Sequence, residues 1–574
     1  MGVRMSDDVH IRGGLVVDGT GTPGRRADVA ISRGRVVAIG DHLEGSAART
    51  IEADGRIVAP GFVDLHTHYD IQAFWDPTLS PSPLHGVTTA IAGNCGFSVA
   101  PLVGAQADYL MQMLARVEGM PLESLAAATD WGWTSFASYL SRLDGTVAPN
   151  LGFLAGHSAI RRVVMGSAAN ERTARPDEVQ AMRRLLGESL EAGALGFSSS
   201  WAPTHLDGDG SPVPSRWADQ SELLELCDEV RRHPSSAVEF IPGLGDFTDA
   251  EGDLMGAMSA AADRPLNWNV LVVIAGLADR IAVQLAASDR AAARGGRVLG
   301  LTIPMSVRPR LSFASGFLLD TIPGWQGPMT EPHADRLARL SSPEGRRALL
   351  ADAGDAQLGL ANFGQYVLTE CTSAATKVYE GRTVAEVAAA RAMDPFDALC
   401  DIAVDNDLRT GFSFPAYGDD EADWEARVRV WRDPRTIIGA SDAGAHLDFL
   451  ATFNYPTVLL RRAVVDLGLL SWEEAISLMT DAPARLYGLV DRGRLVPGAH
   501  ADVVVLDPDR IGPEPVVSRV DLPAGGWRLY GGATGVDHVL VNGVEVVTGG
   551  TIGPARPGTV LRAGRDTRAV SVAG

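Results

Sequence analysis

Residues 57–68, Ile-Val-Ala-Pro-Gly-Phe-Val-Asp-Leu-His-Thr-His, decide the fold and also contain the first candidate functional residues. A mainly apolar run of this length is typical of a buried strand in a parallel sheet, and the run ends in His66 and His68. Side chains two positions apart on a strand point to the same face. Two neutral imidazoles presented together make half of a zinc site. Two histidines at this spacing also occur by chance, so the pair alone does not establish a metal site. The remaining ligands of such a site would come from elsewhere in the chain.

Seven further strand-like runs follow this one. They begin at Val87, Asn150, Ala194, Ala237, Pro265, Arg297 and Thr436. Longer stretches with helical periodicity lie between or after them, which is the pattern of parallel βα units. Eight such units close naturally into a barrel. We therefore predict an α/β fold whose main part, residues 59–485, is a (β/α)₈ TIM-like barrel.

The two ends of the chain have a different pattern. Short runs of alternating apolar and polar residues, separated by glycine, predict strands at both ends. We expect residues 1–58 and 486–574 to form one small β-sandwich domain together.

The seventh and eighth runs are separated by about 130 residues, whereas a crossover needs about a dozen. We therefore predict an insertion after strand 7, at residues 305–435, which is either a lid over the barrel mouth or a surface elaboration.

Composition excludes several classes of partner. The 574 residues include 50 Lys and Arg against 71 Asp and Glu, a net charge of −21, and such a surface repels nucleic acids and anionic lipids. Four cysteines in a chain of 574 residues are too few to form a disulfide framework, which favours a reducing compartment. No apolar stretch resembles a signal peptide or a membrane span. We expect a cytoplasmic protein with a small-molecule substrate and leave homo-oligomerisation open.

Two more strand ends carry residues that could complete a metal site. The second strand ends in Gly93-Asn94-Cys95-Gly96; a buried cysteine is usually a small apolar residue, but a thiolate is a strong zinc ligand. The eighth ends in Ser441-Asp442-Ala443. Asp442 could bind metal and exchange a proton with a water that zinc has acidified to a pKa of about 7. The alternative for Asp442 is a helix cap.

Seven segments, in this order and spread over nearly the whole chain, carry a family resemblance: GFVDLHTH, GVTTAIAGNCG, GHSAIRRVVMG, GALGFSSS, GRTVAEVAAARAMDPFDAL, GASDAGAH and PARLYGLVDRGRLVPGAHADVVVLDP. The set resembles the D-aminoacylase group of the amidohydrolase superfamily, the N-acyl-D-amino-acid deacylases. The resemblance implies a metal-bearing barrel, a β-sandwich made from both termini and an insertion near strand 7. It implies that His66, His68 and Cys95 are metal ligands. Asp442 would be both a ligand and the general acid/base.

The chain departs from this family pattern at strands 5 and 6. In the family each of these strands ends in a histidine ligand, and these histidines build the tighter metal site together with the cysteine. Here Glu239 and Asn269 stand nearest those positions. We expect one zinc, held by His66, His68 and Asp442 with Cys95 or Glu239 as a further ligand, and leave a second zinc open. Glu239 could instead be an ordinary hydrogen-bonded strand residue.

Three residues are candidates for substrate binding. His157 lies in the GH motif of strand 3 and could orient the substrate or stabilise an oxyanion, or it could be a packed, hydrogen-bonded histidine. His205 lies in the Gly-, Pro- and Asp-rich loop that follows strand 4, where it contacts substrate or is an ordinary loop residue. Arg308, with Arg310, follows strand 7 and could bind a substrate carboxylate through its guanidinium; the alternative is a solvated arginine.

We therefore predict a zinc-dependent enzyme that hydrolyses an amide bond other than a peptide bond. The resemblance suggests an N-acyl amino acid, of D configuration, as the substrate. A natural-product amide, cyclic amide or imide is the alternative substrate, and a deaminase is the alternative reaction. An alternative of another class is a metal-free, inactive binding protein of the same shape.

Overall fold

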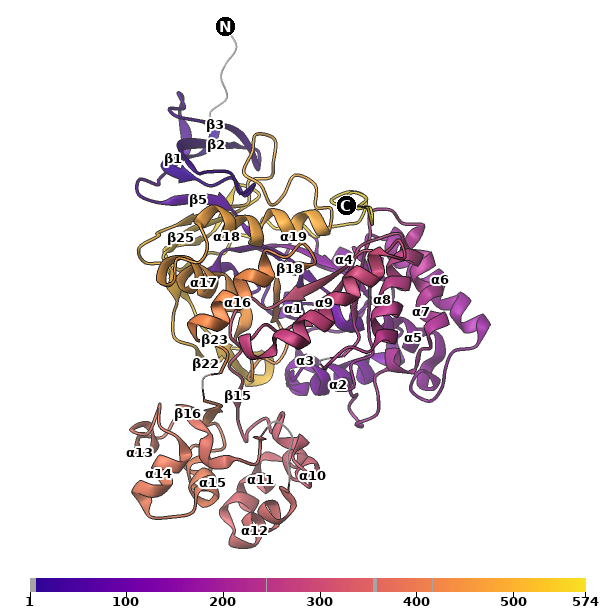
Figure 1. The fold of residues 1–574 in the computed structure, drawn as a ribbon, viewed down its shortest axis with the longest axis vertical. Helices are drawn as coiled ribbons and strands as arrows, with labels where there is room; N and C mark the ends of the chain where they lie inside the picture. The colour runs from indigo at the N-terminus through magenta and orange to yellow at the C-terminus, as the bar shows by residue number, and fades with distance from the viewer. Residues whose placement is uncertain (1–6, 244, 355–358, 416, 574) are drawn as a thin grey trace.

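The computed structural model describes residues 7–573 except 244, 355–358 and 416 (Figure 1). Each of the eight runs predicted as a barrel strand contains a strand, and these strands form three parallel ladders. The first ladder is β6 (Phe62–Asp64), β8 (Val87–Ala92) and β9 (Asn150–Phe153). The second is β10 (Ala155–Gly156), β11 (Gly196–Ser200), β12 (Ala237–Ile241), β13 (Leu266–Leu271), β14 (Val298–Thr302) and β18 (Thr436–Ile438). The third pairs β19 (Ala440–Ala443) with β7 (His66–Thr67).

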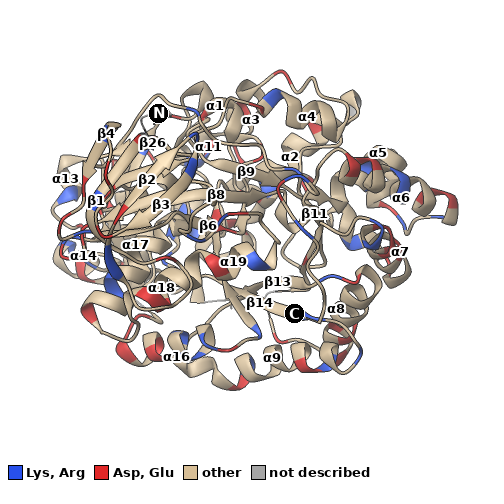
Figure 2. Cartoon of the chain, turned by 90° about the horizontal axis from the view of Figure 1, so that it is seen from above, with Lys and Arg blue, Asp and Glu red and all other residues tan. Residues whose placement is uncertain are grey.

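The ladders continue into one another across single residues. Leu65 separates β6 from β7, Leu154 separates β9 from β10, and Gly439 separates β18 from β19. Eight strand positions therefore follow one another in a circuit of parallel pairs. Figure 2 shows the connecting helices on the outside of these strands: α6 (Pro176–Glu191), α7 (Gln220–Arg231), α8 (Asp249–Ala262), α9 (Ala278–Ala292) and α16 (Glu421–Trp431). Within the described part of the chain, every helix is too short or too polar to cross a membrane.

Both chain ends contribute to one nine-stranded sheet. The strands from the N-terminal end are β1 (Asp7–Val16), β2 (Arg25–Ser32), β3 (Arg35–Gly40), β4 (Ala47–Glu52) and β5 (Ile57–Pro60), and those from the C-terminal end are β20 (Val503–Leu506), β25 (Val536–Val541), β26 (Val544–Thr548) and β27 (Thr551–Ile552). The ends meet where β5 pairs with β20 in antiparallel register.

The single run that the sequence suggested at residues 57–68 is divided between two sheets. Its first half, β5, belongs to the terminal sheet, and only the part from Phe62 onward joins β8. Gly61 makes this crossing because a Cβ there would lie 2.1 Å from Thr88 Oγ1. The chain can pass from one sheet to the next at this point only without a side chain.

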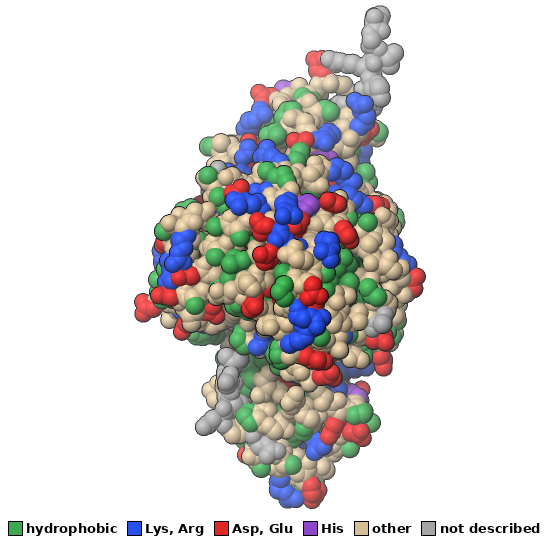
Figure 3. Space-filling view, turned by 90° about the vertical axis from the view of Figure 1, so that its right-hand side faces the viewer, with side chains coloured by type: hydrophobic (Ala, Val, Ile, Leu, Met, Phe, Trp, Pro, Cys, Tyr) green, Lys and Arg blue, Asp and Glu red, His purple; other side chains and the backbone are tan. Residues whose placement is uncertain are grey.

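A separate lobe is inserted between β14 and β18, and we call residues 310–413 the insertion lobe. It contains α10 (Gln326–Thr330), α11 (His333–Ser341), α12 (Pro343–Asp352), α13 (Ala374–Lys377), α14 (Val384–Arg391) and α15 (Pro395–Asp405), with a small sheet of β15 (Arg310–Leu311), β16 (Val367–Glu370) and β17 (Gly411–Ser413). Its own apolar core includes Trp325, Phe363 and Phe396. The lobe projects from one end of the molecule (Figure 1) and narrows where it joins the body (Figure 3). Helix α16 returns the chain to β18.

Candidate active site

The first and eighth strands and the turn after β8 bring His66, His68, Cys95 and Asp442 together. His66 Nε2 lies 3.5 Å from Cys95 Sγ and 3.5 Å from Asp442 Oδ1. His68 Nε2 lies 3.1 Å from the same Asp442 oxygen. The two histidines and the cysteine are at least 95% buried, while the Asp442 side chain keeps 22% of its surface exposed. Residues nearly 380 positions apart in the sequence thus face one another at the carboxyl ends of the strands.

The backbone around these residues is held in an uncommon conformation. Cys95 has φ +56° and Asp442 has φ +59°, the left-handed region that non-glycine residues rarely adopt and that is enriched at functional sites. Asp64 Oδ1 links the first and eighth strands by accepting hydrogen bonds from the backbone N–H groups of His66 (3.4 Å) and Ser441 (3.3 Å). These contacts fix the direction in which the site residues point.

Glu118 is a member of this cluster that the sequence analysis missed. It directly follows α2 (Ala107–Val117) and is 97% buried. Its Oε1 lies 3.3 Å from His68 Nδ1, so His68 is placed between the carboxylates of Glu118 and Asp442. The backbone carbonyl of Glu118 also accepts a hydrogen bond from the N–H of His446. A lone glutamate at a helix end, outside every strand-end motif, gave no sequence signal.

Glu239 lies next to the cluster and hydrogen-bonds to the backbone of Cys95. Its Oε2 accepts the backbone N–H of Cys95 at 3.0 Å, and its Oε1 accepts a short hydrogen bond from the Asn269 side-chain amide. Burial raises the pKa of Glu239 well above its ordinary range, although these two hydrogen bonds oppose the shift. The two residues at the strand 5 and strand 6 positions are therefore bound to each other, and among the described residues Glu239 is outside both groups whose ligand atoms converge.

Electrostatics in the cluster favour a cation. Burial, and then the charge of Asp442, raises the pKa of Glu118 well above its usual range. Burial also opposes ionisation of Asp442, but hydrogen bonds from His66 and His68 outweigh it and hold its pKa well below its usual range. Burial lowers the pKa of His68 and raises that of the Cys95 thiol. A bound divalent ion would favour the ionised form of both carboxylates, because its charge offsets the cost of their burial.

The donor atoms fit a zinc-like metal. Among the described residues, two overlapping groups have ligand atoms within 4.8 Å of one another: His66 with His68 and Cys95, and His68 with Glu118 and Asp442. Imidazole nitrogen, thiolate sulfur and carboxylate oxygen are the ordinary ligands of zinc. A bound cation would also favour the thiolate form of Cys95, whose pKa is otherwise raised.

The three predicted substrate-binding residues lie in three different environments. His157 is fully buried; its Nδ1 lies 2.8 Å from Ser199 Oγ, and its Nε2 lies 2.8 Å from Glu222, which also pairs with Arg161. These contacts use both ring nitrogens, so they favour the packed, hydrogen-bonded alternative.

His205 lies close to the cluster. Its Nδ1 is 2.7 Å from Ser200 Oγ, and its ring packs on Phe97 at 4.9 Å between centroids. Burial lowers its pKa to about 3, with further contributions from the charges of His446 and His68. Arg308 is different: it is 60% exposed, pairs with Asp419 at 2.6 Å and is separate from the His66–Asp442 cluster.

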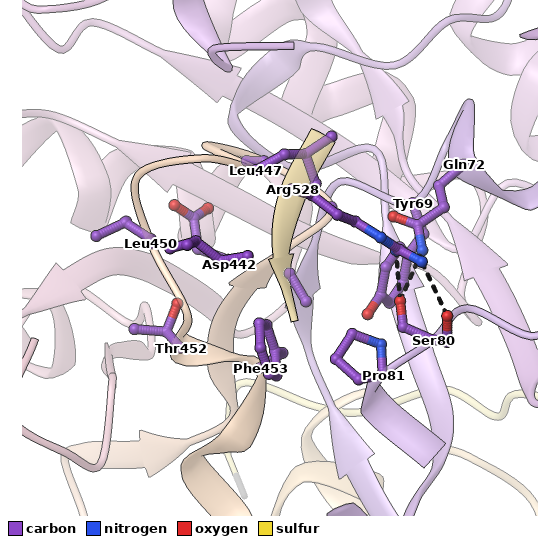
Figure 4. Close-up of a pocket in the computed structure, with 14 residues that line it drawn as sticks. Tyr69, Gln72, Ser80, Pro81, Asp442, Leu447, Leu450, Thr452, Phe453 and Arg528 are labelled. Atoms are coloured by element: carbon purple, nitrogen blue, oxygen red, sulfur yellow. Dashed lines mark hydrogen bonds between the residues drawn. The ribbon is translucent and has the colours of Figure 1, made fainter. Parts of the chain in front are cut away.

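The insertion lobe reaches the site through one aromatic side chain. Phe317 packs on His446 with ring centroids 5.0 Å apart, and His446 Nε2 lies 3.8 Å from Asp442 Oδ2. Through this contact the insertion lobe lies one side chain away from Asp442. On its other side Asp442 borders a small pocket, with Arg528 on the opposite wall bonded to Ser80 (Figure 4).

Comparisons with known proteins agree with this geometry. A model of the Amidohydrolase family matches residues 49–547. The chain is 29% identical over 598 residues to N-acyl-D-glutamate deacylase of Alcaligenes xylosoxydans xylosoxydans, covering 99% of this chain and 98% of that protein. It resembles N-acyl-D-glutamate deacylase from Bordetella bronchiseptica, solved with zinc and a phosphonate mimic of the tetrahedral intermediate (TM-score 0.65, 27% identity, 97% and 100% coverage). It also resembles a D-aminoacylase with a binuclear metal center (TM-score 0.63, 26% identity, 97% and 100% coverage).

The chain therefore belongs to the amidohydrolase family, and the predicted resemblance to the D-aminoacylase group is confirmed. Its structural neighbours share a mixed α/β architecture of the TIM-barrel type. Together with the cluster of ligand atoms, these relatives support metal-dependent hydrolysis of a C–N bond other than a peptide bond.

Proposed function

We propose that this protein is a zinc-dependent deacylase that hydrolyses the amide bond of an N-acyl amino acid. We also propose that its circuit of eight parallel strand positions is a closed (β/α)₈ barrel, which holds the site. The observation that carries the proposal is the convergence of His66 and His68 on Asp442 at the strand ends, with Cys95 beside His66. The deacylase relatives support the choice of an N-acyl amino acid, and of the D configuration.

His66, His68, Cys95 and Asp442 would hold the metal. When bound, zinc polarises a carbonyl group and acidifies water. In our proposal the Asp442 carboxylate takes the proton of the attacking water and returns it to the leaving nitrogen, so that the amide C–N bond breaks and an acid and an amine are released. The hydrogen bonds from His66 and His68 that lower the pKa of Asp442 keep it ionised, which is the form that a general base requires. Its partial exposure leaves it accessible to substrate.

Glu118 is proposed to orient His68. The imidazole can offer only one nitrogen to a metal, and a carboxylate on the other nitrogen fixes the tautomer and raises ligand basicity. With Nδ1 facing Glu118 at 3.3 Å, Nε2 is directed toward Asp442 and the metal position. Glu118 thus acts through His68, with no contact to substrate required.

Replacing Glu118 by Gln tests this role. The amide keeps the size of the side chain but removes its charge, so we expect zinc affinity to fall about 10- to 100-fold, as for other carboxylates behind ligating histidines. The measurement is a competitive zinc titration against a chromogenic chelator. Glu123→Gln, in the helix that follows, is the matched control. Unchanged zinc affinity in Glu118→Gln would contradict the assignment.

We also propose that the site holds one zinc per chain. Glu239 and Asn269 occupy the positions where the family resemblance implies two histidine ligands. Here they hydrogen-bond to each other, and Glu239 also accepts the backbone N–H of Cys95. Metal analysis after dialysis should give one zinc per chain in the native protein. The Glu239→His, Asn269→His double variant should bind a second. Two tightly bound zinc ions in the native protein would contradict the proposal.

The function itself is tested with a panel of N-acetyl and N-octanoyl derivatives of D- and L-amino acids, assayed with and without added zinc. We expect zinc-dependent release of the carboxylic acid without ammonia, with the D series faster than the L series. Ammonia release would favour a deaminase, and turnover of hydantoins alone would favour a cyclic amide substrate. An absence of zinc binding and of turnover would favour the inactive binding protein.

A further inference from the structure

A large cavity lies away from the His66–Asp442 cluster. It has a volume of about 610 Å³ and lies in the seam between the insertion lobe and the body. The β15–β17 sheet of the lobe, the helical segment 454–462 and the C-terminal segment 513–529 line it. We call it the seam cavity. Most of its exposed lining is apolar, with contributions from Phe414, Val458 and Val516.

Two buried polar side chains on its wall lack partners for some of their atoms. Arg310 is 93% buried, and within the described residues its Nε and Nη1 have no hydrogen-bond partner, while Nη2 bonds to Glu370 at 2.9 Å. Asn454 is equally buried, and its Oδ1 is unpaired among the same residues. A buried donor or acceptor left unpaired costs about 1–3 kcal/mol. Arg310 and Asn454 therefore place incompletely satisfied polar side chains in the wall of this cavity.

The charges around the seam cavity favour an anion. Four of its lining residues are arginines and two are acidic, in a chain whose net charge is −21. Arg310 pairs with Glu370 and Arg308 with Asp419. Arg461 and Arg462, however, share one carboxylate, that of Asp466. Among the described residues, these four arginines therefore pair with three carboxylates, which leaves one positive charge in excess.

From this arrangement we propose that the seam cavity is a binding site for a monocarboxylate with an apolar chain. The carboxylate would bind the arginines, and the chain would lie along Phe414, Val458 and Val516. Free fatty acids and N-acyl amino acids share this chemistry. The site is distinct from the proposed metal site, so the proposal stands whether or not the deacylase function does.

The seam cavity is nevertheless next to the active-site loop. Thr452 and Leu529 line both this cavity and the small pocket beside Asp442. The Thr452 hydroxyl donates a short hydrogen bond to the backbone carbonyl of Ser441, the residue before Asp442. Binding must therefore be measured separately from catalysis, in protein stripped of metal.

Calorimetric titration of the metal-stripped full chain with octanoate, octanamide and N-octanoylglycine tests the proposal. We expect one octanoate per chain, bound at least tenfold more tightly than the uncharged octanamide, because hydrogen bonds to charged groups are the stronger ones. The same preference for a carboxylate should hold for N-octanoylglycine. Whichever carboxylate binds more tightly identifies the natural source of the ligand. Equal binding of octanoate and octanamide would overturn the proposal.

Two variants locate the site. Val458→Trp fills the cavity and should weaken octanoate binding at least tenfold, whereas Val465→Trp, exposed at the end of the same helical segment, should not. Arg310→Gln should also weaken octanoate binding at least tenfold. Its control is Arg339→Gln, because Arg339 lies in α11, on the insertion lobe, and pairs with Glu331 just before that helix. If Arg310→Gln fails to fold, the two tryptophan variants still decide. Unchanged binding in Val458→Trp would exclude the seam cavity as the site.

Discussion

Replacing Asp442 by Asn is expected to lower kcat for amide hydrolysis by about 10³-fold or more, which corresponds to roughly 4 kcal/mol of transition-state stabilisation. Asn keeps the shape of the side chain and can still hydrogen-bond, but it cannot accept and return a proton. Asp442 Oδ1 lies 3.5 Å from His66 Nε2 and 3.1 Å from His68 Nε2, and in our proposal the same carboxylate also binds the metal. The loss should therefore persist at saturating zinc, where weakened metal affinity no longer limits the rate.

The measurement is the kcat of Asp442→Asn against the native protein on the best N-acyl amino acid of the panel, with zinc varied until the rate is constant. Asp289→Asn, a mostly exposed aspartate paired with Arg435, is the control and should retain the native rate. Circular dichroism verifies the fold of both variants. A kcat of Asp442→Asn within tenfold of the native value would refute its role as general acid/base.

Strand-level features were the part of this molecule that the sequence predicted well. The periodicity of apolar residues and the uninterrupted apolar runs identify the strands. Because the carboxyl ends of parallel strands meet at one edge, residues that follow such a strand, as His66, Cys95 and Asp442 do, are placed at that edge. Every predicted run contains a strand. The run at residues 57–68 shows the limit of this reasoning, because apolar content does not reveal that Gly61 passes the chain from one sheet to another.

Residues outside strand ends were harder to predict. Glu118 and His446 enter the site through the end of α2 and through a left-handed turn, and no local pattern distinguishes them from surface residues. Arg308 was predicted from its position after strand 7, but the insertion lobe that begins there carries it to the seam cavity. Such placements depend on how a long insertion packs against the body, which is set by contacts between distant segments.

Replacing His66 by Ala is expected to remove most of the zinc from the protein. His66 Nε2 lies 3.5 Å both from Cys95 Sγ and from Asp442 Oδ1, so this nitrogen is central to the ligand set. Its loss leaves His68 as the only imidazole of the group with Cys95. We expect zinc affinity to fall by about 100-fold or more, and the rate of hydrolysis to fall with it. This loss is larger than the 10- to 100-fold that is typical when a residue hydrogen-bonded to a metal ligand is replaced.

Thermal unfolding with and without zinc gives a readout that is independent of turnover. A ligand that binds only the folded state stabilises it by about 4.1 kcal/mol at a concentration 1,000 times its Kd, so zinc should raise the Tm of the native protein. The same zinc concentration should leave the Tm of His66→Ala nearly unchanged. His333→Ala, at a half-exposed histidine on the insertion lobe paired with Asp407, should respond like the native protein. An undiminished zinc response in His66→Ala would show that the metal binds elsewhere, because the imidazole would then contribute nothing to its coordination.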